Sequence, residues 1–437
     1  MLTEKEIFKF QTSSLLSTKK YLKECKNKEV NLNVSPLCDF VTWTNCLGLQ
    51  KLLLLKSRKN ISIGFIANLL KEIFAIGKNA EILKFSSKIK SQNKINIVYS
   101  YCSKENFSKN GLFYDTYFKQ TSLYKKNTYW FLISLDNYIP KKTKNIFILY
   151  RKKSFFNFLY LFKFITKNIF KKNFIHNLNN TTNISRLYSQ NFYKTFNKFR
   201  FNLYLPYENR PHQNAIINVA KKISRNNKVY GYYHRMPEPF QSEMIYKSKD
   251  LDKLFVCSKI QKEVFKKYFY WPENKVKIIP SIRYDKLKIR TNVIFIPYEI
   301  KDIDFYLSRL KFLLIKEKMS TKNITVSIHP LKRKHKDHIS FKKKILKLLK
   351  ENKILSKKNK NIPIILSEPG GVAAECLETV GQAFHITNST FDIFSEKIWK
   401  NIKVLKQSDY IYKYVKLKKN NFININSQKN NFEKLLR

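Results

Sequence analysis

Two histidines and two glutamates lie close together in the middle of the chain, after two short apolar runs. Glu208 is followed by His212, and His234 is followed by Arg235 and Glu238. Side chains just beyond the carboxyl ends of neighbouring parallel strands meet in one crevice. A carboxylate or an imidazole there can act as a general base for a hydroxyl group. We therefore predict Glu208 and His234 as catalytic residues, and His212, Arg235 and Glu238 as contacts of the acceptor that supplies the hydroxyl. Taken singly, each could also cap a helix or face solvent, and for His212 that reading is favoured.

A second set of candidates lies in the last third of the chain. His329 and Pro330 end an apolar run, and the stretch "SEPGGVAAE", which begins at Ser367, joins another run to a helix through Gly370 and Gly371. Glycine lets a ligand approach the backbone closely, and the free N–H groups of a helix's first turn attract anions. The chain has only eight glycines, so a pair at this place indicates a phosphate-binding turn.

Each part of this second set also has a simpler interpretation. A lone Gly-Gly pair more often forms a tight turn, and Glu375 could be solvated rather than bound to a ribose or sugar hydroxyl. The combination with His329 one strand earlier favours phosphate binding. Arg333 belongs to a basic triplet at 332–334, which is either a neighbour of that phosphate or a solvated loop.

No metal site is predicted. The triplets Asp250-Leu251-Asp252 and Asp302-Ile303-Asp304 resemble metal–diphosphate ligands, but both lie where a helix is expected to begin, and acidic residues are favourable there for electrostatic reasons. The histidines at 329, 335 and 338 have no nearby cysteine or glutamate to complete a zinc site.

The elements that must position these residues follow a βαβ pattern. In the second half, short apolar runs predict strands at 228–234, 253–258, 275–280, 292–297, 323–330, 362–367 and 382–387. Amphipathic stretches between them predict helices at 258–269, 303–318, 339–353 and 371–381, with Gly381 as a C-terminal cap. Strands at 94–101, 128–135 and 145–150, with helices between them, predict a further α/β sheet in the first half.

This alternation predicts an α/β protein of two doubly wound, Rossmann-like domains that face a cleft. We place an acceptor-side domain at 1–288, a nucleotide-donor-binding domain at 289–408 and a peripheral C-terminal tail at 409–437. The boundary falls in a polar, basic connector.

The formal net charge of the 437 residues is +54, which suggests a polyanionic partner. However, Lys, Asn, Ile, Phe and Tyr are enriched together while Arg, Ala, Gly and Pro are scarce, so genome composition explains much of the charge. A nucleic-acid-binding protein would use more arginine. The charge is compatible with an anionic membrane surface and a phosphate-bearing substrate, and no nucleic-acid partner is expected.

The six cysteines are scattered and the first residues lack a signal-peptide pattern, which together predict reduced thiols in the cytoplasm. No uninterrupted apolar run approaches the length of a spanning helix. Residues 155–174 are aromatic and contain Lys163 and Lys167. They predict an interfacial helix on the inner face of the plasma membrane or, equally, a core helix with a basic outer edge.

Several of these stretches resemble one known group. "YENRPHQNAIINVAK" (207–221), "VYGYYH" (229–234), the His-Pro at 329–330, "SEPGGVAAECLETVG" (367–381) and "GLFYDTYF" (111–118) look like bacterial surface-carbohydrate biosynthesis proteins of the GT-B glycosyltransferase type. The His-Pro and the small-residue loop are also similar to those of bacterial sialyltransferases and capsule Kdo transferases, where they contact the phosphate of a CMP-sugar. Those enzymes usually carry Ser-Ser or Ser-Thr where this chain has Gly370 and Gly371, which leaves the donor open.

The resemblance implies a metal-independent glycosyltransferase without a cofactor, acting in lipopolysaccharide or capsule assembly. Its partners would be a nucleotide-sugar donor, with CMP-linked donors among the candidates, and a lipid-linked or saccharide acceptor. The donor would contact His329, Pro330, Arg333, Ser367, Gly370, Gly371 and Glu375. Two alternatives remain: transfer of a polyol phosphate from a CDP-activated donor, and a non-catalytic, basic nucleic-acid-binding protein.

Overall fold

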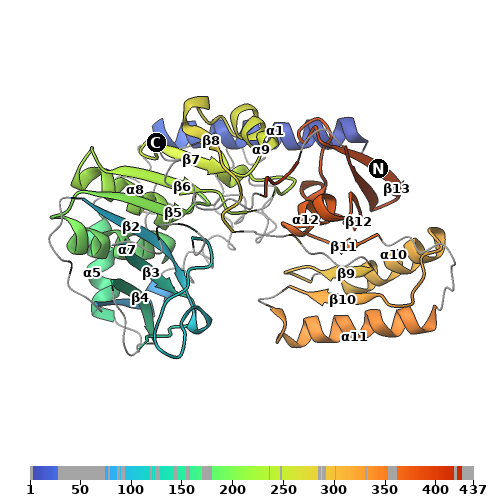
Figure 1. Cartoon of the computed structure of the whole chain (residues 1–437), viewed down its shortest axis with the longest axis horizontal. Coiled ribbons are helices and arrows are strands. Elements are labelled where there is room, and N and C mark those ends of the chain that lie inside the picture. The colour runs from blue at the N-terminus through green and yellow to red at the C-terminus, as the bar shows by residue number, and fades with distance from the viewer. Residues whose placement is uncertain are drawn as a thin grey trace.

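The chain folds into two α/β lobes joined side by side (Figure 1). The computed structural model describes residues 3–27, 74–76, 79–85, 89, 94–118, 121, 123, 128–140, 145–153, 158–169, 180–235, 237–246, 249–283, 287, 292–300, 302–329, 332–352, 362–417 and 421–425. The predicted fold class, two doubly wound α/β sheets, is confirmed.

The first sheet has eight strands in the order β1-β4-β3-β2-β5-β6-β7-β8, and only β1 (Asn79–Phe85) is antiparallel to its neighbour. The chain builds outward from β2 (Ile95–Cys102) through β3 (Thr128–Ser134) to β4 (Ile146–Lys153). It then starts again beside β2 with β5 (Phe201–Pro206) and continues through β6 (Lys228–Tyr232), β7 (Lys253–Val256) and β8 (Val276–Ile278). This change of direction creates a switch point between β2 and β5, and ligands of open α/β sheets bind beyond the strand ends at such a point.

Helices cover this sheet because their apolar faces need a partner. They are α7 (Asn180–Phe196), α8 (Pro211–Ile223) and α9 (Lys259–Lys267). The described residues of α5 (Phe158–Ile169) lie outside this core, and Phe164 packs with Ile76 instead. Proline suits the first turn of α8 because its missing N–H would have no partner in the helix. The Ser258 hydroxyl caps α9 by accepting a hydrogen bond from the backbone N–H of Gln261.

The second sheet has the order β10-β9-β11-β12-β14-β13. Four strands are parallel: β9 (Val293–Ile296), β10 (Thr325–Ile328), β11 (Ile364–Leu366) and β12 (Gln382–Ile386). The chain passes from β9 out to β10 and back to β11, so a second switch point lies between β9 and β11. The helices of this lobe are α10 (Ile303–Lys316), α11 (Lys336–Glu351) and α12 (Val372–Thr379), and Asp302 caps α10 as its acidic position predicts.

A strand hairpin extends this sheet past the predicted end of the lobe. The sequence predicts a tail from 409, but β13 (Ile402–Ser408) and β14 (Ile411–Lys416) form a hairpin, and β14 pairs with β12. Phe422 beyond it is fully buried. Lysines on the solvent face of the hairpin conceal its alternation in the sequence. The predicted helices near β2 and β3 also differ from the structure, because described residues 103–118 contain only a 3-10 turn at Lys104–Asn106 and 135–140 contain no helix.

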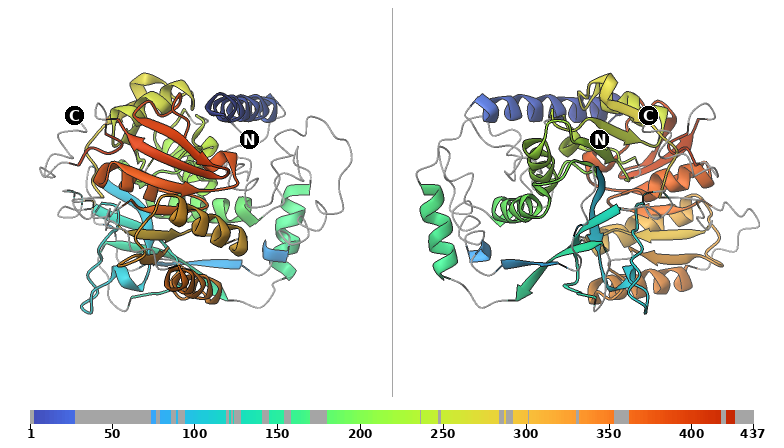
Figure 2. Two further views of the ribbon diagram at one scale, coloured as in Figure 1. Left: turned by 90° about the vertical axis from the view of Figure 1, so that its right-hand side faces the viewer. Right: turned by 60° about the vertical axis from the view of Figure 1, so that its left-hand side comes forward.

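One apolar cluster and one helix span both lobes, and the second lobe also has an apolar core of its own. Ala373 and Leu377 of α12 belong to the core cluster of the first sheet. Helix α1 (Glu4–Asn27) lies along both lobes in Figure 1, and the turned views of Figure 2 show it at the same edge of the molecule. The side chain of Gln11 donates to backbone carbonyls of Thr390 and Ile393 in the second lobe, while Phe8 packs edge-on against Tyr268 of the first lobe. No described helix is long and apolar enough to cross a membrane.

Candidate active site

Glu208 lies just beyond the carboxyl end of β5, at the switch point of the first sheet. Its turn is fixed by Gln213 of α8, whose side-chain oxygen accepts hydrogen bonds from the backbone N–H groups of Glu208 (2.9 Å) and Arg210 (3.1 Å). Asn209 takes a left-handed φ of 57° in this turn, which asparagine tolerates better than most residues. The turn places the Glu208 carboxylate beside the end of β6.

Three side chains from this region surround the Glu208 carboxylate. Oε1 lies 3.0 Å from His234 Nε2 and 2.8 Å from Arg235 Nε, and Oε2 lies 3.2 Å from Arg210 Nε. Burial favours the neutral acid, but Arg235, His234 and Arg210 outweigh it and hold the pKa of Glu208 well below its usual range. A carboxylate with so low a pKa is a weak base. Its contacts suit it to orient His234 rather than to remove a proton.

His234, which follows β6, is buried, and its Nδ1 is shielded from solvent. Because Nε2 faces the Glu208 carboxylate, the neutral ring carries its proton there and its lone pair on Nδ1. Nδ1 has no hydrogen-bond partner among the described residues. Burial lowers the pKa of His234 below 6.5, with Arg283 and Arg235 adding to the effect and Glu208 opposing it. At pH 7 the ring is therefore neutral and can accept a proton on Nδ1.

Arg235 is surrounded by carboxylates of the protein. Besides the contact with Glu208, its Nη1 lies 3.6 Å from Glu238 Oε2 and 3.4 Å from Glu243 Oε1. Burial raises the pKa of Glu243 to about 7, with Arg235 acting against it and Glu238 adding to it. Burial also raises the pKa of Glu238, and so does the charge of Glu368 from the second lobe. Arg235 therefore holds these glutamates, and its contact with an anionic acceptor group stays a prediction.

His212 points to a different set of neighbours. Its Nδ1 lies 2.7 Å from the Tyr99 hydroxyl and its Nε2 lies 3.5 Å from the Tyr101 hydroxyl, and the edges of both rings pack on it. The structure thus brings together Glu208, His234, Arg235 and Glu238, and places His212 in an adjoining aromatic cluster.

The donor-side residues lie along the carboxyl edge of the second sheet. His329 follows β10, and its ring packs edge-on against Tyr298, which follows β9, with ring centroids 5.1 Å apart. Burial lowers the pKa of His329, and His338 and Lys332 lower it further. Arg333 is exposed, and Pro330 lies outside the described residues. Since β9 separates β10 from β11, His329 is two strand positions from the glycine loop.

The glycine loop follows β11 at the switch point of this sheet. Ser367 and Gly370 have left-handed φ values of 58° and 47°. A Cβ atom at Gly370 would meet nothing within 4 Å, so open space lies over the loop. Buried His385 supports the loop from β12, because its Nε2 hydrogen-bonds the Ser367 carbonyl while its Nδ1 lies 2.7 Å from the Tyr414 hydroxyl. Gly371 is the N-cap residue of α12, and the first backbone N–H groups of this helix have no acceptor within it.

The two sheet edges are close enough for their charges to interact. Glu375 in the first turn of α12 is coupled to Arg283, which follows β8 in the first lobe. Burial raises the pKa of Glu375, and Arg283 counteracts part of that rise. Across the same junction, the like charge of Glu368 raises the pKa of Glu238. Charged residues near the candidate base and charged residues near the glycine loop therefore lie within electrostatic range of each other across the junction of the lobes.

Sequence reasoning missed three residues of this site: Tyr117, Glu243 and Arg283. The Tyr117 ring packs on His234 with centroids 4.3 Å apart. Buried Asp115 holds Tyr117 in place by accepting hydrogen bonds from the backbone N–H groups of Tyr117 (2.8 Å) and Phe118 (2.6 Å). The only sequence signal was an isolated Asp inside the aromatic stretch at 111–118.

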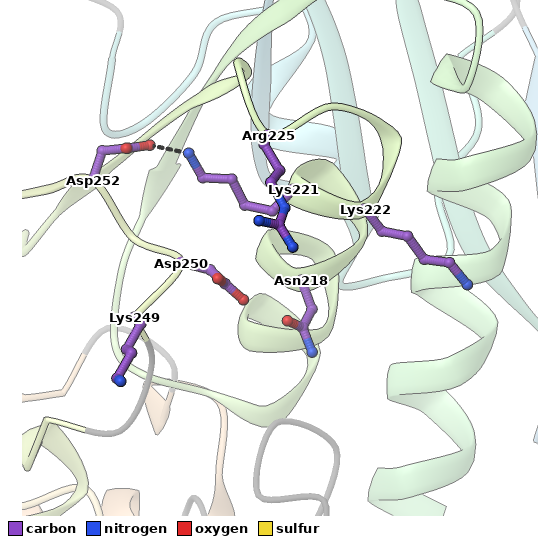
Figure 3. A pocket seen from close by; sticks show the side chains of 7 residues that line it. All are labelled: Asn218, Lys221, Lys222, Arg225, Lys249, Asp250 and Asp252. Carbon is purple, nitrogen blue, oxygen red and sulfur yellow. Dashed lines mark hydrogen bonds and ion pairs between the residues drawn. The ribbon is translucent and has the colours of Figure 1, made fainter.

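A surface cavity of about 470 Å³ lies away from this site, near the amino ends of β6 and β7 (Figure 3). It is lined by Asn218, Lys221, Lys222, Arg225, Lys249, Asp250 and Asp252. The Asp252 carboxylate accepts hydrogen bonds from Lys221 Nζ (2.6 Å) and the backbone N–H of Val229 (2.7 Å). The triplet at 250–252 thus precedes strand β7, not the helix that the sequence suggests, and its second aspartate connects β6 to α8. Within the described residues no cluster of three or more His, Cys, Asp or Glu side chains could hold a metal ion.

Comparison with known proteins gives little further information. No family model matches the chain, and no curated protein matches it. A crystal structure of a glycosyltransferase from Rickettsia africae ESF-5 is similar over 70% of this chain and 87% of that chain, with 13% sequence identity and a TM-score of 0.30. At so low a TM-score the function must be argued from the residues of this chain.

Proposed function

We propose that the protein is a glycosyltransferase that moves a sugar from a nucleotide-sugar donor to a hydroxyl group of a lipid-linked or saccharide acceptor. One observation carries the proposal: neutral His234, oriented by Glu208, has no hydrogen-bond partner for Nδ1 among the described residues, beside the switch point of the first sheet. The motif resemblance to surface-carbohydrate glycosyltransferases supports the same reading and suggests lipopolysaccharide or capsule assembly.

In this proposal the donor binds at the carboxyl edge of the second sheet. The backbone around Gly370 and Gly371 and the first turn of α12 receive the phosphate, since the free N–H groups and the helix dipole favour an anion. His329 contacts the nucleotide from β10, and Glu375 accepts a hydrogen bond from a ribose or sugar hydroxyl. Ser367 shapes the glycine loop, and Pro330 and Arg333 are donor contacts close to His329 in the sequence. Neither a metal nor a cofactor is part of the proposal.

The acceptor hydroxyl approaches from the first lobe. Its proton moves to Nδ1 of His234 as its oxygen bonds to the anomeric carbon of the sugar. The bond from that carbon to the phosphate oxygen breaks, and the electron pair leaves with the nucleotide. Glu208 keeps the His234 ring in the required orientation and stabilises its positive charge after proton transfer, and Arg235 holds Glu208.

We also propose that α5 rests on an anionic membrane surface at the cytoplasmic side, where a lipid-linked acceptor would be found. Its side chains Phe158, Leu159 and Phe162 are 73%, 83% and 68% exposed, next to exposed Lys163 and Lys167. Exposed aromatic and aliphatic groups beside lysines are typical of interfacial helices.

Donor binding tests the proposal. Calorimetric titration of CMP-, CDP-, UDP- and GDP-linked sugars should find one nucleotide class that binds wild type, and His329→Ala should weaken that binding about tenfold or more. Lys343→Ala, on an exposed position of α11, serves as a matched control and should bind like wild type. Absence of binding for every class, or equal binding by the His329 variant, would contradict the donor site.

A further inference from the structure

Arg283 lies at the junction of the two lobes. It follows β8, at the end of the first sheet, and is partly buried. Its guanidinium carbon lies 5.6 Å from the centroid of the Tyr117 ring. The Tyr117 ring in turn packs on His234, at 4.3 Å between centroids. Arg283 and His234 therefore contact the same aromatic ring.

Several charged and titratable groups face His234. Glu208 accepts its Nε2 proton at 3.0 Å, and Arg235 and Arg283 are the cations that act on it. Tyr117 contacts its ring and stays neutral, because burial raises the pKa of Tyr117 to about 12. Glu208 favours the charged imidazole, whereas the two arginines oppose it. Of the two arginines, Arg235 is held by Glu208 at 2.8 Å.

Arg283 also acts on the other side of the site. It is coupled to Glu375, which lies in the first turn of α12 directly after Gly370 and Gly371. The same guanidinium is thus within electrostatic range of both the proposed base and the proposed phosphate site.

We propose that Arg283 couples occupation of the phosphate site at the start of α12 to the protonation of His234. The inference rests on the donor site proposed above and adds a role for a residue outside it. A phosphate bound at the loop brings negative charge next to the guanidinium, which reduces the positive potential that Arg283 imposes on His234. Donor binding therefore makes His234 a better proton acceptor at the stage when a proton must be accepted.

Thermodynamic linkage makes this coupling reciprocal. If a bound phosphate raises the proton affinity of His234, protonation of His234 strengthens phosphate binding by the same factor. A shift of one pH unit in the midpoint corresponds to a tenfold change in affinity. Nucleotide binding should therefore weaken as pH rises through the His234 transition.

The test follows the titration of His234 by NMR with histidine-selective ¹³C labelling. The chain has seven histidines, and His234→Gln identifies the signal by its loss. Arg283→Gln removes the charge, Arg283→Lys keeps it without the planar group, and Arg225→Gln is the matched control at the distant cavity. Each protein is titrated alone and with saturating CMP or CDP, whichever binds.

In the free protein, Arg283→Gln should raise the His234 midpoint by about one pH unit, the effect of a single nearby charge, while Arg283→Lys and Arg225→Gln stay near wild type. The bound nucleotide should raise the His234 titration midpoint in the wild type, and should raise it less in Arg283→Gln. An unchanged midpoint in free Arg283→Gln, or an equal nucleotide effect in wild type and Arg283→Gln, overturns the inference. If no nucleotide binds the wild type, the proposed donor site is overturned and the coupling with it. This holds even if Arg283→Gln shifts the His234 titration midpoint in the free protein. Arg283→Lys provides the comparison if the Gln variant does not fold.

Discussion

Replacing Glu243 with glutamine should stabilise the protein at alkaline pH. Glu243 is almost fully buried, and its nearest cation, Arg235, is shared with Glu208 and Glu238. Burial is the largest cause of the pKa of about 7, against an ordinary value of 4.5. A buried carboxylate whose nearest guanidinium is shared with two other carboxylates is costly to ionise.

The magnitude follows from the pKa. A rise from 4.5 to about 7 corresponds to about 3.5 kcal/mol at about 1.4 kcal/mol per unit, of which about 3 kcal/mol develops between pH 4.5 and 8.5 because the unfolded carboxyl is already half ionised at pH 4.5. Because the folded pKa is raised, the folded protein binds more protons than the unfolded chain between pH 4.5 and 7, so this group makes stability fall as pH rises through that window. The glutamine side chain resembles the protonated acid but does not ionise, so the variant loses no stability through this position between pH 4.5 and 7. The free energy of unfolding of Glu243→Gln minus that of wild type should therefore be about 3 kcal/mol larger at pH 8.5 than at pH 4.5.

Urea unfolding followed by tryptophan fluorescence at pH 4.5, 6 and 8.5 measures this difference. Glu263→Gln, on an exposed position of α9, is the matched control and should show no such pH-dependent gain. The reasoning is refuted if the Glu243 variant and wild type differ by the same free energy at all three pH values, or if the variant becomes relatively less stable at pH 8.5.

Three further predictions use other parts of the structure. Gly231→Ala should lower the free energy of unfolding by about 1–3 kcal/mol in urea, because the new Cβ would lie 2.9 Å from Cβ of buried Tyr207; an unchanged midpoint would contradict the packing. Gln11→Ala should cost about 1–3 kcal/mol, because it leaves two backbone carbonyls of the second lobe without their donor, and a loss below about 0.5 kcal/mol would argue against α1 as a bridge. Phe162→Glu on α5 should reduce sedimentation with phosphatidylglycerol vesicles severalfold and leave sedimentation with phosphatidylcholine vesicles low, whereas equal sedimentation with both proteins would exclude α5 as the membrane contact.

Much of the fold follows from local pattern. The parallel strands of both sheets are short apolar runs between amphipathic helices, and strands covered on both faces leave that signal because both faces must be apolar. The β13–β14 hairpin was missed because lysines interrupt the apolar alternation of its strands, which therefore resemble a polar tail in the sequence. Helix α1 forms in a region with few sequence signals, and its bridging role depends on contacts with residues more than 370 positions away.

The candidate site was predictable where residues follow strands directly. Glu208 and His234 come directly after β5 and β6, so the topology alone brings them together. Tyr117, Glu243 and Arg283 come from loops, and only tertiary contacts bring those loops to His234 and Arg235. The sequence shows which groups are present but not which of them is ion-paired. Distances were therefore needed to assign the orienting role to Glu208 and the role of base to His234.

The central claim is that His234 removes a proton during transfer from a nucleotide-sugar bound on the second lobe. Its most direct test measures nucleotide release from the donor that binds, with water as acceptor, in wild type and His234→Gln. The account predicts that His234→Gln binds the donor within about twofold of wild type and loses at least about a hundredfold in turnover. Equal turnover in the two proteins, or loss of turnover only in proportion to lost donor binding, would contradict it.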